Sequence, residues 1–176
     1  MKYRQDETDF EITLSPQAPA VASVILLHGL GADGHDFVPI VDELGLPDSL
    51  PVRFVFPHAP LRPVTVNNGY VMRAWYDIKS FTPAGRADVS GTVESSRRVA
   101  DYVARERQLG VAPARVVLAG FSQGGAVALY TGLRYPDRKS TGSVLVPKLL
   151  GIYESELYPV LERWIAGGPD MVVDVG

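Results

Sequence analysis

The hydrophobic residues of this chain fall into short apolar runs, separated by segments with an apolar residue at every third or fourth position. The short runs predict strands at residues 10–14, 23–27, 51–56 and 115–119, and SVILL and RVVLA have the continuous apolar character of buried parallel strands. The helical spacing predicts helices at residues 88–108 and 123–135 and a shorter one at 37–44. Strands that alternate with helices predict an α/β fold with a mostly parallel sheet flanked by helices.

Polar residues mark two further segments. Residues 57–87 are rich in Pro, Gly and Asn around the motif MRAWYDI, and they predict a long surface loop of the kind that often carries function. The helix at 88–108 can be capped by Asp88 or Ser90. Five of its charged residues form a cluster that predicts a solvated helix face, and these are Arg97, Arg98, Arg105, Glu106 and Arg107.

The pattern changes after Pro136. Residues 143–147 form one possible strand and 153–164 one possible amphipathic helix, and the chain ends on the apolar stretch MVVDVG. We interpret residues 1–176 as one domain whose fold is incomplete at the C-terminus. An exposed sheet edge would then favour self-association.

Composition narrows the class of protein. The chain has 176 residues, of which 46% are hydrophobic and 21% charged, as expected for one globular domain. The net charge of -3 gives no reason to expect nucleic acid as a partner, and the absence of cysteine excludes thiolate metal sites and disulfides. The N-terminus is charged and no apolar run is long enough for stable membrane insertion, so we expect a cytoplasmic protein without a metal.

The stretch GFSQGG, between the predicted strand at 115–119 and the predicted helix at 123–135, carries the main candidate chemistry. It fits the nucleophile elbow G-x-S-x-G, in which a serine occupies a strained strand-to-helix turn. The positions two before and two after the serine must be small, and here they are Gly120 and Gly124. Ser122 is therefore the candidate nucleophile, with a helix-capping serine as the alternative.

The earlier glycine-rich loop, LLHGLG, supplies what an elbow hydrolase needs next. One oxyanion donor is the backbone N–H after the nucleophile, here Gln123, and the second comes from an HG-type loop, here Leu30. His28 precedes this loop. It could act as a catalytic base or as a structural residue that orients the loop, and we prefer the second interpretation. An alternative is that GLGADG, residues 29–34, binds a dinucleotide, but no acidic residue ends the predicted strand at 51–56.

Four motifs in order, LLHGLGADGHDF, FPHAPLRPVT, MRAWYDI and AGFSQGGAVALY, resemble the phospholipase/carboxylesterase family of α/β-hydrolases, which includes acyl-protein thioesterases. The resemblance is clearest over residues 24–136, and residues 137–176 diverge. It implies an α/β-hydrolase fold and hydrolysis of carboxylic esters or thioesters through a Ser-Asp-His triad without a cofactor. It also implies that Trp75 and His28 lie at the substrate site, although Trp75 could simply pack the long loop.

The triad is the point at which the chain departs from the family. GGPDMVV matches the segment that carries the family's aspartate, so Asp170 is the candidate, but the family's histidine follows that aspartate and this chain has none there. Its three histidines, His28, His35 and His58, all precede Ser122. We therefore expect a serine esterase or acyl thioesterase that is nearly inactive as written, with a non-catalytic acyl-ligand-binding or interaction domain as the alternative.

Overall fold

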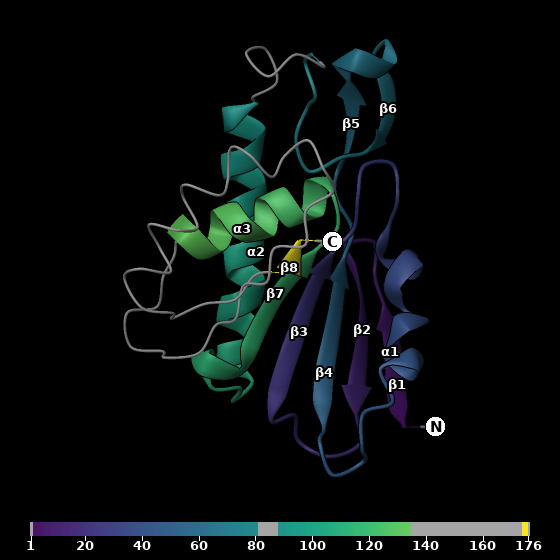
Figure 1. The fold of residues 1–176 in the computed structure, drawn as a ribbon, viewed down its shortest axis with the longest axis vertical. Coiled ribbons are helices and arrows are strands. Elements are labelled where there is room, and N and C mark those ends of the chain that lie inside the picture. Colours follow the sequence, from purple (N-terminus) through teal and green to yellow (C-terminus); the bar gives the residue numbers. More distant parts are fainter. Residues whose placement is uncertain (1, 81–87, 135–173, 176) are drawn as a thin grey trace.

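A computed structural model describes residues 2–80, 88–134 and 174–175 of the chain. Its central sheet has six strands in the order β1-β2-β4-β3-β7-β8 (Figure 1). These strands are β1 Tyr3–Glu7, β2 Glu11–Pro16, β3 Ala22–Leu27, β4 Val52–Pro57, β7 Val116–Gly120 and β8 Asp174–Val175. The strands β4, β3, β7 and β8 are parallel to one another, whereas β1 and β2 pair in antiparallel fashion. The predicted α/β fold with a mostly parallel sheet is thus confirmed.

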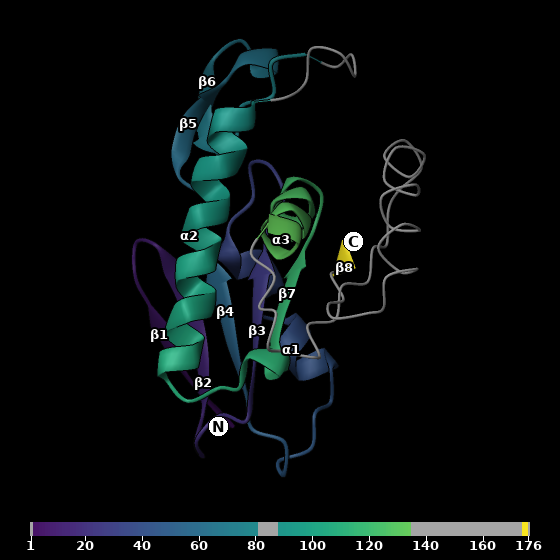
Figure 2. The same ribbon diagram turned by 90° about the vertical axis from the view of Figure 1, so that its left-hand side faces the viewer.

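Helices cover both faces of this sheet. The long helix α2, Val89–Gln108, packs against α3, Gln123–Arg134, and α3 packs against β7. The short helix α1, Ile40–Glu43, follows the 3-10 helix η1, Gly34–Phe37, on the opposite face (Figure 2). Two shorter 3-10 turns are η2, Thr65–Asn67, and η4, Pro113–Arg115. Of the helix expected at 37–44, only residues 40–43 form an α-helix, and Phe37 is the last residue of η1.

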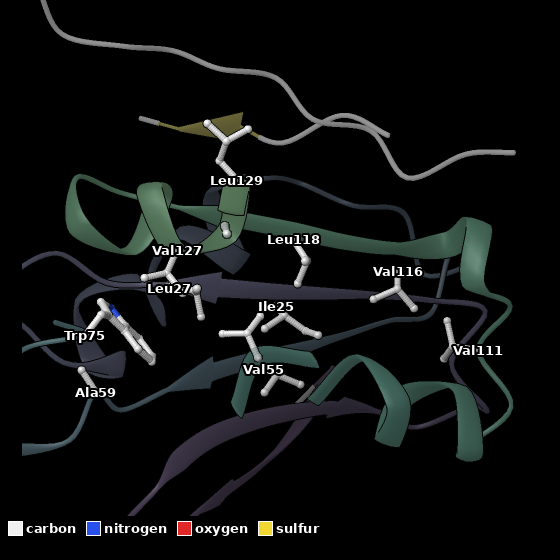
Figure 3. Close-up of a cluster of buried hydrophobic side chains, with 12 residues drawn as sticks. Ile25, Leu27, Val55, Ala59, Trp75, Val111, Val116, Leu118, Val127 and Leu129 are labelled. Atoms are coloured by element: carbon white, nitrogen blue, oxygen red, sulfur yellow. The ribbon is translucent and has the colours of Figure 1, made fainter. Parts of the chain in front are cut away.

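The two hydrophobic cores follow from the alternation of side chains along the strands. In β3, Ile25 and Leu27 are fully buried toward α2 and α3, and they share a cluster with Val55, Leu118 and Val127 (Figure 3). The alternate residues pack on the other side, in a cluster with Ile12, Leu14, Val41, Phe54 and Phe56. Because β3 and β4 are buried on both faces, their sequences show continuous apolar runs.

The segment expected to be a long surface loop contains a β-hairpin. Its strands are β5, Leu61–Val64, and β6, Tyr70–Arg73, and the hairpin extends beyond one end of the main sheet (Figure 1). The residues after it return to the protein interior, where Ala74 and Trp75 are buried. The prediction of a loop was wrong here because proline and glycine at the hairpin ends conceal two four-residue strands.

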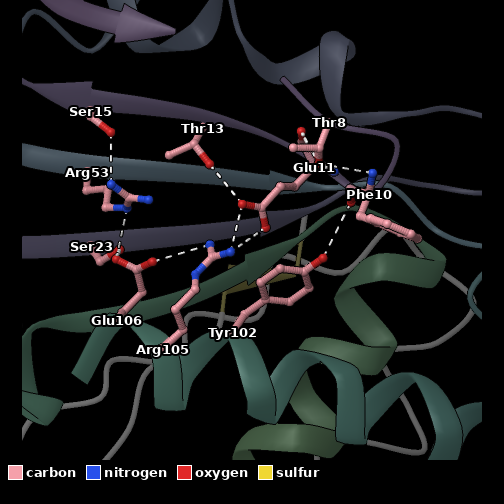
Figure 4. A network of polar contacts seen from close by, with 10 residues as sticks. All are labelled: Thr8, Phe10, Glu11, Thr13, Ser15, Ser23, Arg53, Tyr102, Arg105 and Glu106. Atoms are coloured by element: carbon pink, nitrogen blue, oxygen red, sulfur yellow. Dashed lines mark hydrogen bonds and ion pairs between the residues drawn. The ribbon is translucent and has the colours of Figure 1, made fainter. Parts of the chain in front are cut away.

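A polar network joins the C-terminal part of α2 to the sheet (Figure 4). The Glu106 carboxylate is completely buried and accepts a hydrogen bond of 2.8 Å from the Ser23 hydroxyl. It also forms ion pairs of 3.3 Å with Arg53 and 3.4 Å with Arg105. Arg105 in turn makes two hydrogen bonds of 2.7 and 2.8 Å to Glu11. These partners provide the compensation that a buried charge requires.

This network corrects the prediction for the charges of α2. Arg97, Arg98 and Arg107 are exposed, as a solvated helix face requires. Arg105 and Glu106 instead face the sheet, and the burial of Glu106 depends on Arg53 of β4, a partner that is distant in sequence. The strand expected at 143–147 and the helix expected at 153–164 lie outside the described residues. The assignment of all 176 residues to one domain stays a prediction.

Candidate active site

Ser122 lies in the turn between β7 and α3, and its backbone is strained. Its φ angle is 53°, in the left-handed region that L-residues rarely adopt. The strain is held by hydrogen bonds on both sides of the serine. The N–H of Phe121 donates to the carbonyl of Leu27 at 2.9 Å, and the N–H of Ala126 donates to the carbonyl of Ser122 at 3.1 Å. Ser122 itself is exposed, so its hydroxyl group is accessible.

The two glycines that flank the serine are required by contact distances. A Cβ atom on Gly120 would lie 2.5 Å from the carbonyl carbon of Gly124 and 2.6 Å from the N of Gly125. A Cβ atom on Gly124 would lie 2.6 Å from the carbonyl carbon of Leu27 and would overlap the carbonyl oxygen of His28. A serine that merely capped a helix would not need such close packing of strand, turn and helix. The geometry is that of a nucleophile elbow.

The HG-type loop begins beside the elbow because β3 and β7 are neighbours in register, with Leu27 opposite Gly120. Gly31 has a φ of 76°, which only glycine adopts without strain, and its N–H donates to the carbonyl of Arg73 at 2.9 Å. Within the described part of the chain, the N–H groups of Leu30 and Gln123 donate to no protein acceptor. The role of these two groups as oxyanion donors stays a prediction.

Side chains from three segments meet beneath this loop. The carboxamide oxygen of Gln123 accepts a hydrogen bond of 2.8 Å from the N–H of Trp75, and its nitrogen donates to the carbonyl of Tyr76 at 2.7 Å. The indole N–H of Trp75 donates to the carbonyl of His28 at 2.8 Å. Trp75 is 1% exposed, and Figure 3 shows its indole ring in the hydrophobic cluster. Its position favours a role in packing and orientation over direct contact with a substrate.

His28 is fully buried, and both of its ring nitrogens are engaged. Its Nδ1 lies 2.7 Å from the carbonyl oxygen of Gly29, so Nδ1 carries the proton, and Nε2 accepts a hydrogen bond of 2.9 Å from the N–H of Ala59. Burial lowers the pKa of His28, which keeps the ring neutral. No acceptor nitrogen is left for a serine proton, so the geometry favours the loop-orienting role over that of a base or a substrate contact.

The other two histidines are also committed to local structure. The Nδ1 of His58 accepts a hydrogen bond of 3.1 Å from the N–H of Gly34, and burial lowers its pKa. The ring of His35 lies between two carboxylates, with Nδ1 at 2.9 Å from Asp33 and Nε2 at 3.1 Å from Glu7. The hydrogen bond that the His35 ring donates to Asp33 raises the pKa of His35 and favours its doubly protonated, cationic form. None of these contacts is with Ser122.

The structure therefore brings together five of the predicted site residues, which are Ser122, Leu30, Gln123, Trp75 and His28. Asp170 lies outside the described residues. The role of the Gln123 side chain was not predicted, because no sequence pattern indicates that its carboxamide contacts residues 75 and 76. GLGADG leads into a 3-10 helix of only four residues, which does not provide the long helix that binds a pyrophosphate.

Residues 2–80, 88–134 and 174–175 contain no group of three or more His, Asp or Glu side chains arranged to hold a metal. No helix within these ranges is long and apolar enough to span a membrane.

The fold and the elbow define the class of protein, the α/β-hydrolases. The profile of the phospholipase/carboxylesterase family matches residues 8–146, and the chain belongs to this family. The structure of Arabidopsis thaliana SOBER1 is 35% identical, with a TM-score of 0.62, over 69% of this chain and 57% of that protein.

Two relatives are named acyl-protein thioesterase 1. The protein of Schizosaccharomyces pombe is 39% identical over 127 residues, which are 72% of this chain and 56% of that protein. The protein of Cryptococcus neoformans is 34% identical over 174 residues, which are 93% of this chain and 72% of that protein. The chain thus matches little more than half of the S. pombe relative and of the SOBER1 structure.

Proposed function

We propose that this chain is a serine hydrolase of carboxylic esters or thioesters that acts through an acyl-enzyme. The Ser122 oxygen attacks the carbonyl carbon of a small acyl substrate, and the serine proton passes to a base. The N–H groups of Leu30 and Gln123 hold the oxyanion that forms. The carbon–oxygen or carbon–sulfur bond to the leaving group then breaks, the leaving group takes up a proton, and water later releases the acid from Ser122.

The φ angle of 53° at Ser122, between two glycines that accept no Cβ atom, carries this proposal. A strained serine of this kind persists only when the surrounding structure enforces it, and such residues cluster at active sites. The relatives named acyl-protein thioesterase 1 favour an acyl thioester as the substrate. The proposal has three further parts. They are a cytoplasmic location, a role for Asp170 in orienting a base, and self-association through a sheet edge.

In this proposal the rate of ester hydrolysis is limited by the lack of a positioned base for the Ser122 proton. His28 and His35 use both ring nitrogens elsewhere, and His58 uses its Nδ1. The chain alone should therefore turn over esters at the residual level left when one triad member is missing, about 10³- to 10⁴-fold over water. The same observation favours a second candidate function, a domain that binds acyl groups without reacting.

Covalent labelling distinguishes the two functions. The chain and Ser122→Ala are incubated with a fluorophosphonate probe, with and without excess imidazole, and the modified residue is located by mass spectrometry. Slow labelling at Ser122 that imidazole accelerates, and that Ser122→Ala abolishes, supports the hydrolase. If no serine-dependent labelling occurs at any imidazole concentration, the binding domain is the better description.

A further inference from the structure

We infer that the side chain of Gln123 is a positioning residue for the oxyanion hole, and that it acts through Trp75 and the carbonyl of His28. This inference rests on the proposed function. Gln123 has so far entered only through its backbone N–H, whereas its side chain is 4% exposed and makes two hydrogen bonds of its own. They join the elbow to Trp75 and Tyr76, which lie 48 and 47 residues earlier in the chain.

The first step runs from the elbow to residues 75 and 76. The carboxamide of Gln123 accepts from the N–H of Trp75 and donates to the carbonyl of Tyr76, at 2.8 and 2.7 Å. A carboxamide can accept from the one and donate to the other at the same time, without carrying a charge. The hydroxyl of Ser95 on α2 also donates to the carbonyl of Trp75, so this short segment is held from two sides.

The second step runs from Trp75 to the HG-type loop. The indole N–H donates to the carbonyl of His28 at 2.8 Å, and the two rings lie 5.2 Å apart. The plane of a peptide is fixed when its carbonyl is held, so this bond orients the peptide between His28 and Gly29, directly before Leu30. The chain of bonds therefore starts at one oxyanion donor, Gln123, and ends beside the other, Leu30.

Gln123→Met tests the inference, because methionine has a similar length and keeps the backbone N–H that binds the oxyanion. The inactivation rate kinact and the binding constant KI of a fluorophosphonate are measured in a fixed excess of imidazole. We expect kinact to fall about 10- to 100-fold, as for a displaced donor, with KI close to the wild-type value. Gln108→Met, the same change on the exposed end of α2, should alter neither constant.

Gln123→Glu adds a readout that a loss of packing would not affect. An ionised carboxylate can accept from Trp75 but repels the carbonyl of Tyr76, whereas the protonated acid can do what the amide does. The kinact of Gln123→Glu, relative to wild type at each pH, should recover as the pH falls, and that of Gln123→Met should not. Proton exchange of the Trp75 indole N–H, assigned by NMR with Trp164→Phe, should be slow in wild type and faster in Gln123→Met.

The outcomes separate the two claims. If wild type is labelled at Ser122, and Gln123→Met is folded and labelled equally fast, the positioning role is wrong and the proposed function stands. Fast indole exchange in wild type would also refute the positioning role. If wild type is not labelled at all, the proposed function fails and the inference fails with it, even where slow indole exchange shows that the hydrogen bonds exist.

Discussion

The nucleophile elbow and the three histidines are positioned by different kinds of contact. At the elbow, two glycines and backbone hydrogen bonds hold Ser122 at a φ of 53° with its side chain exposed. The histidines use their side chains to hold loops, since His28 accepts from Ala59 and His58 accepts from Gly34. The elbow thus presents an exposed serine, whereas the imidazole groups of His28 and His58 are engaged in hydrogen bonds with the backbone.

This difference shows that the parts of a hydrolase site can be judged separately. The proposed nucleophile and the proposed oxyanion donors depend on local backbone geometry and on two adjacent parallel strands, β3 and β7. A base depends on a free ring nitrogen, which the hydrogen bonds of each histidine decide.

The elbow should tolerate no added methyl group. In Gly124→Ala the new Cβ would meet the backbone of Leu27 and His28, so we expect a loss of about 3 kcal/mol or more in the free energy of unfolding. Gly45→Ala is the matched control, because Gly45 has a φ of 57° but no atom within 4 Å of the added Cβ. Its cost should be only about 1 kcal/mol. Equal losses in urea unfolding would contradict the steric account.

His28 should matter for stability as a buried, fully bonded side chain. In His28→Gln at least one of the partners Gly29 and Ala59 loses its bond, so we expect a loss of about 2 kcal/mol. The exposed His35 is the control, and His35→Gln should stay within about 0.5 kcal/mol at neutral pH. Thermal or urea unfolding measures both. A His28→Gln protein as stable as wild type would mean that the ring is not needed to hold the loop.

Added imidazole should supply part of the missing base. A positioned base contributes about 10²- to 10⁴-fold, and a free one lacks the advantage of proximity, so we expect roughly a tenfold rise in ester hydrolysis. The rise should be absent in Ser122→Ala. A wild-type rate that does not respond to imidazole would indicate either that a base is already present or that Ser122 does not react.

The smallest effect that we expect is on the pH dependence of stability, which should differ in sign between His35 and the two buried histidines. Burial lowers the pKa of His28 and His58, so the unfolded chain binds protons more readily and stability falls as the pH drops below about 6.5. The raised pKa of His35 acts in the opposite sense, because its contribution is present at low pH and is lost as the pH rises through its folded pKa.

Urea midpoints between pH 5 and pH 8 can test these signs. Relative to wild type, His28→Gln should lose less stability on acidification, and His35→Gln should lose more. Three curves that stay parallel over this range would show that neither ring titrates differently in the folded and unfolded chains.

Much of the fold could be predicted because its strands have continuous apolar runs. The expected strands at 23–27 and 115–119 lie within one residue of β3 and β7, and the helix at 88–108 begins one residue before α2. The hairpin β5–β6 was missed, since its strands are only four residues long and include Pro63. The charged edge strand β1 was missed because four of its five residues are exposed and show no apolar pattern.

In the candidate site, too, the sequence predicts the locally encoded parts and not the contacts between distant segments. Ser122 and the oxyanion donors follow from motifs that encode backbone shape locally. The burial of Trp75 and the contacts of the Gln123 carboxamide depend on residues about 47 positions apart, which no local pattern indicates. Likewise, only the structure shows that the Nε2 of His28 is already occupied by the N–H of Ala59.

The decisive measurement is the turnover of a short p-nitrophenyl ester by this chain and by Ser122→Ala, both without added imidazole. If the elbow is intact and no histidine of the chain serves as its base, the two rates should agree within about threefold, both at the residual level. A wild-type rate that exceeds that of Ser122→Ala by several orders of magnitude would contradict the account. It would show that a proton acceptor does serve Ser122 in this chain.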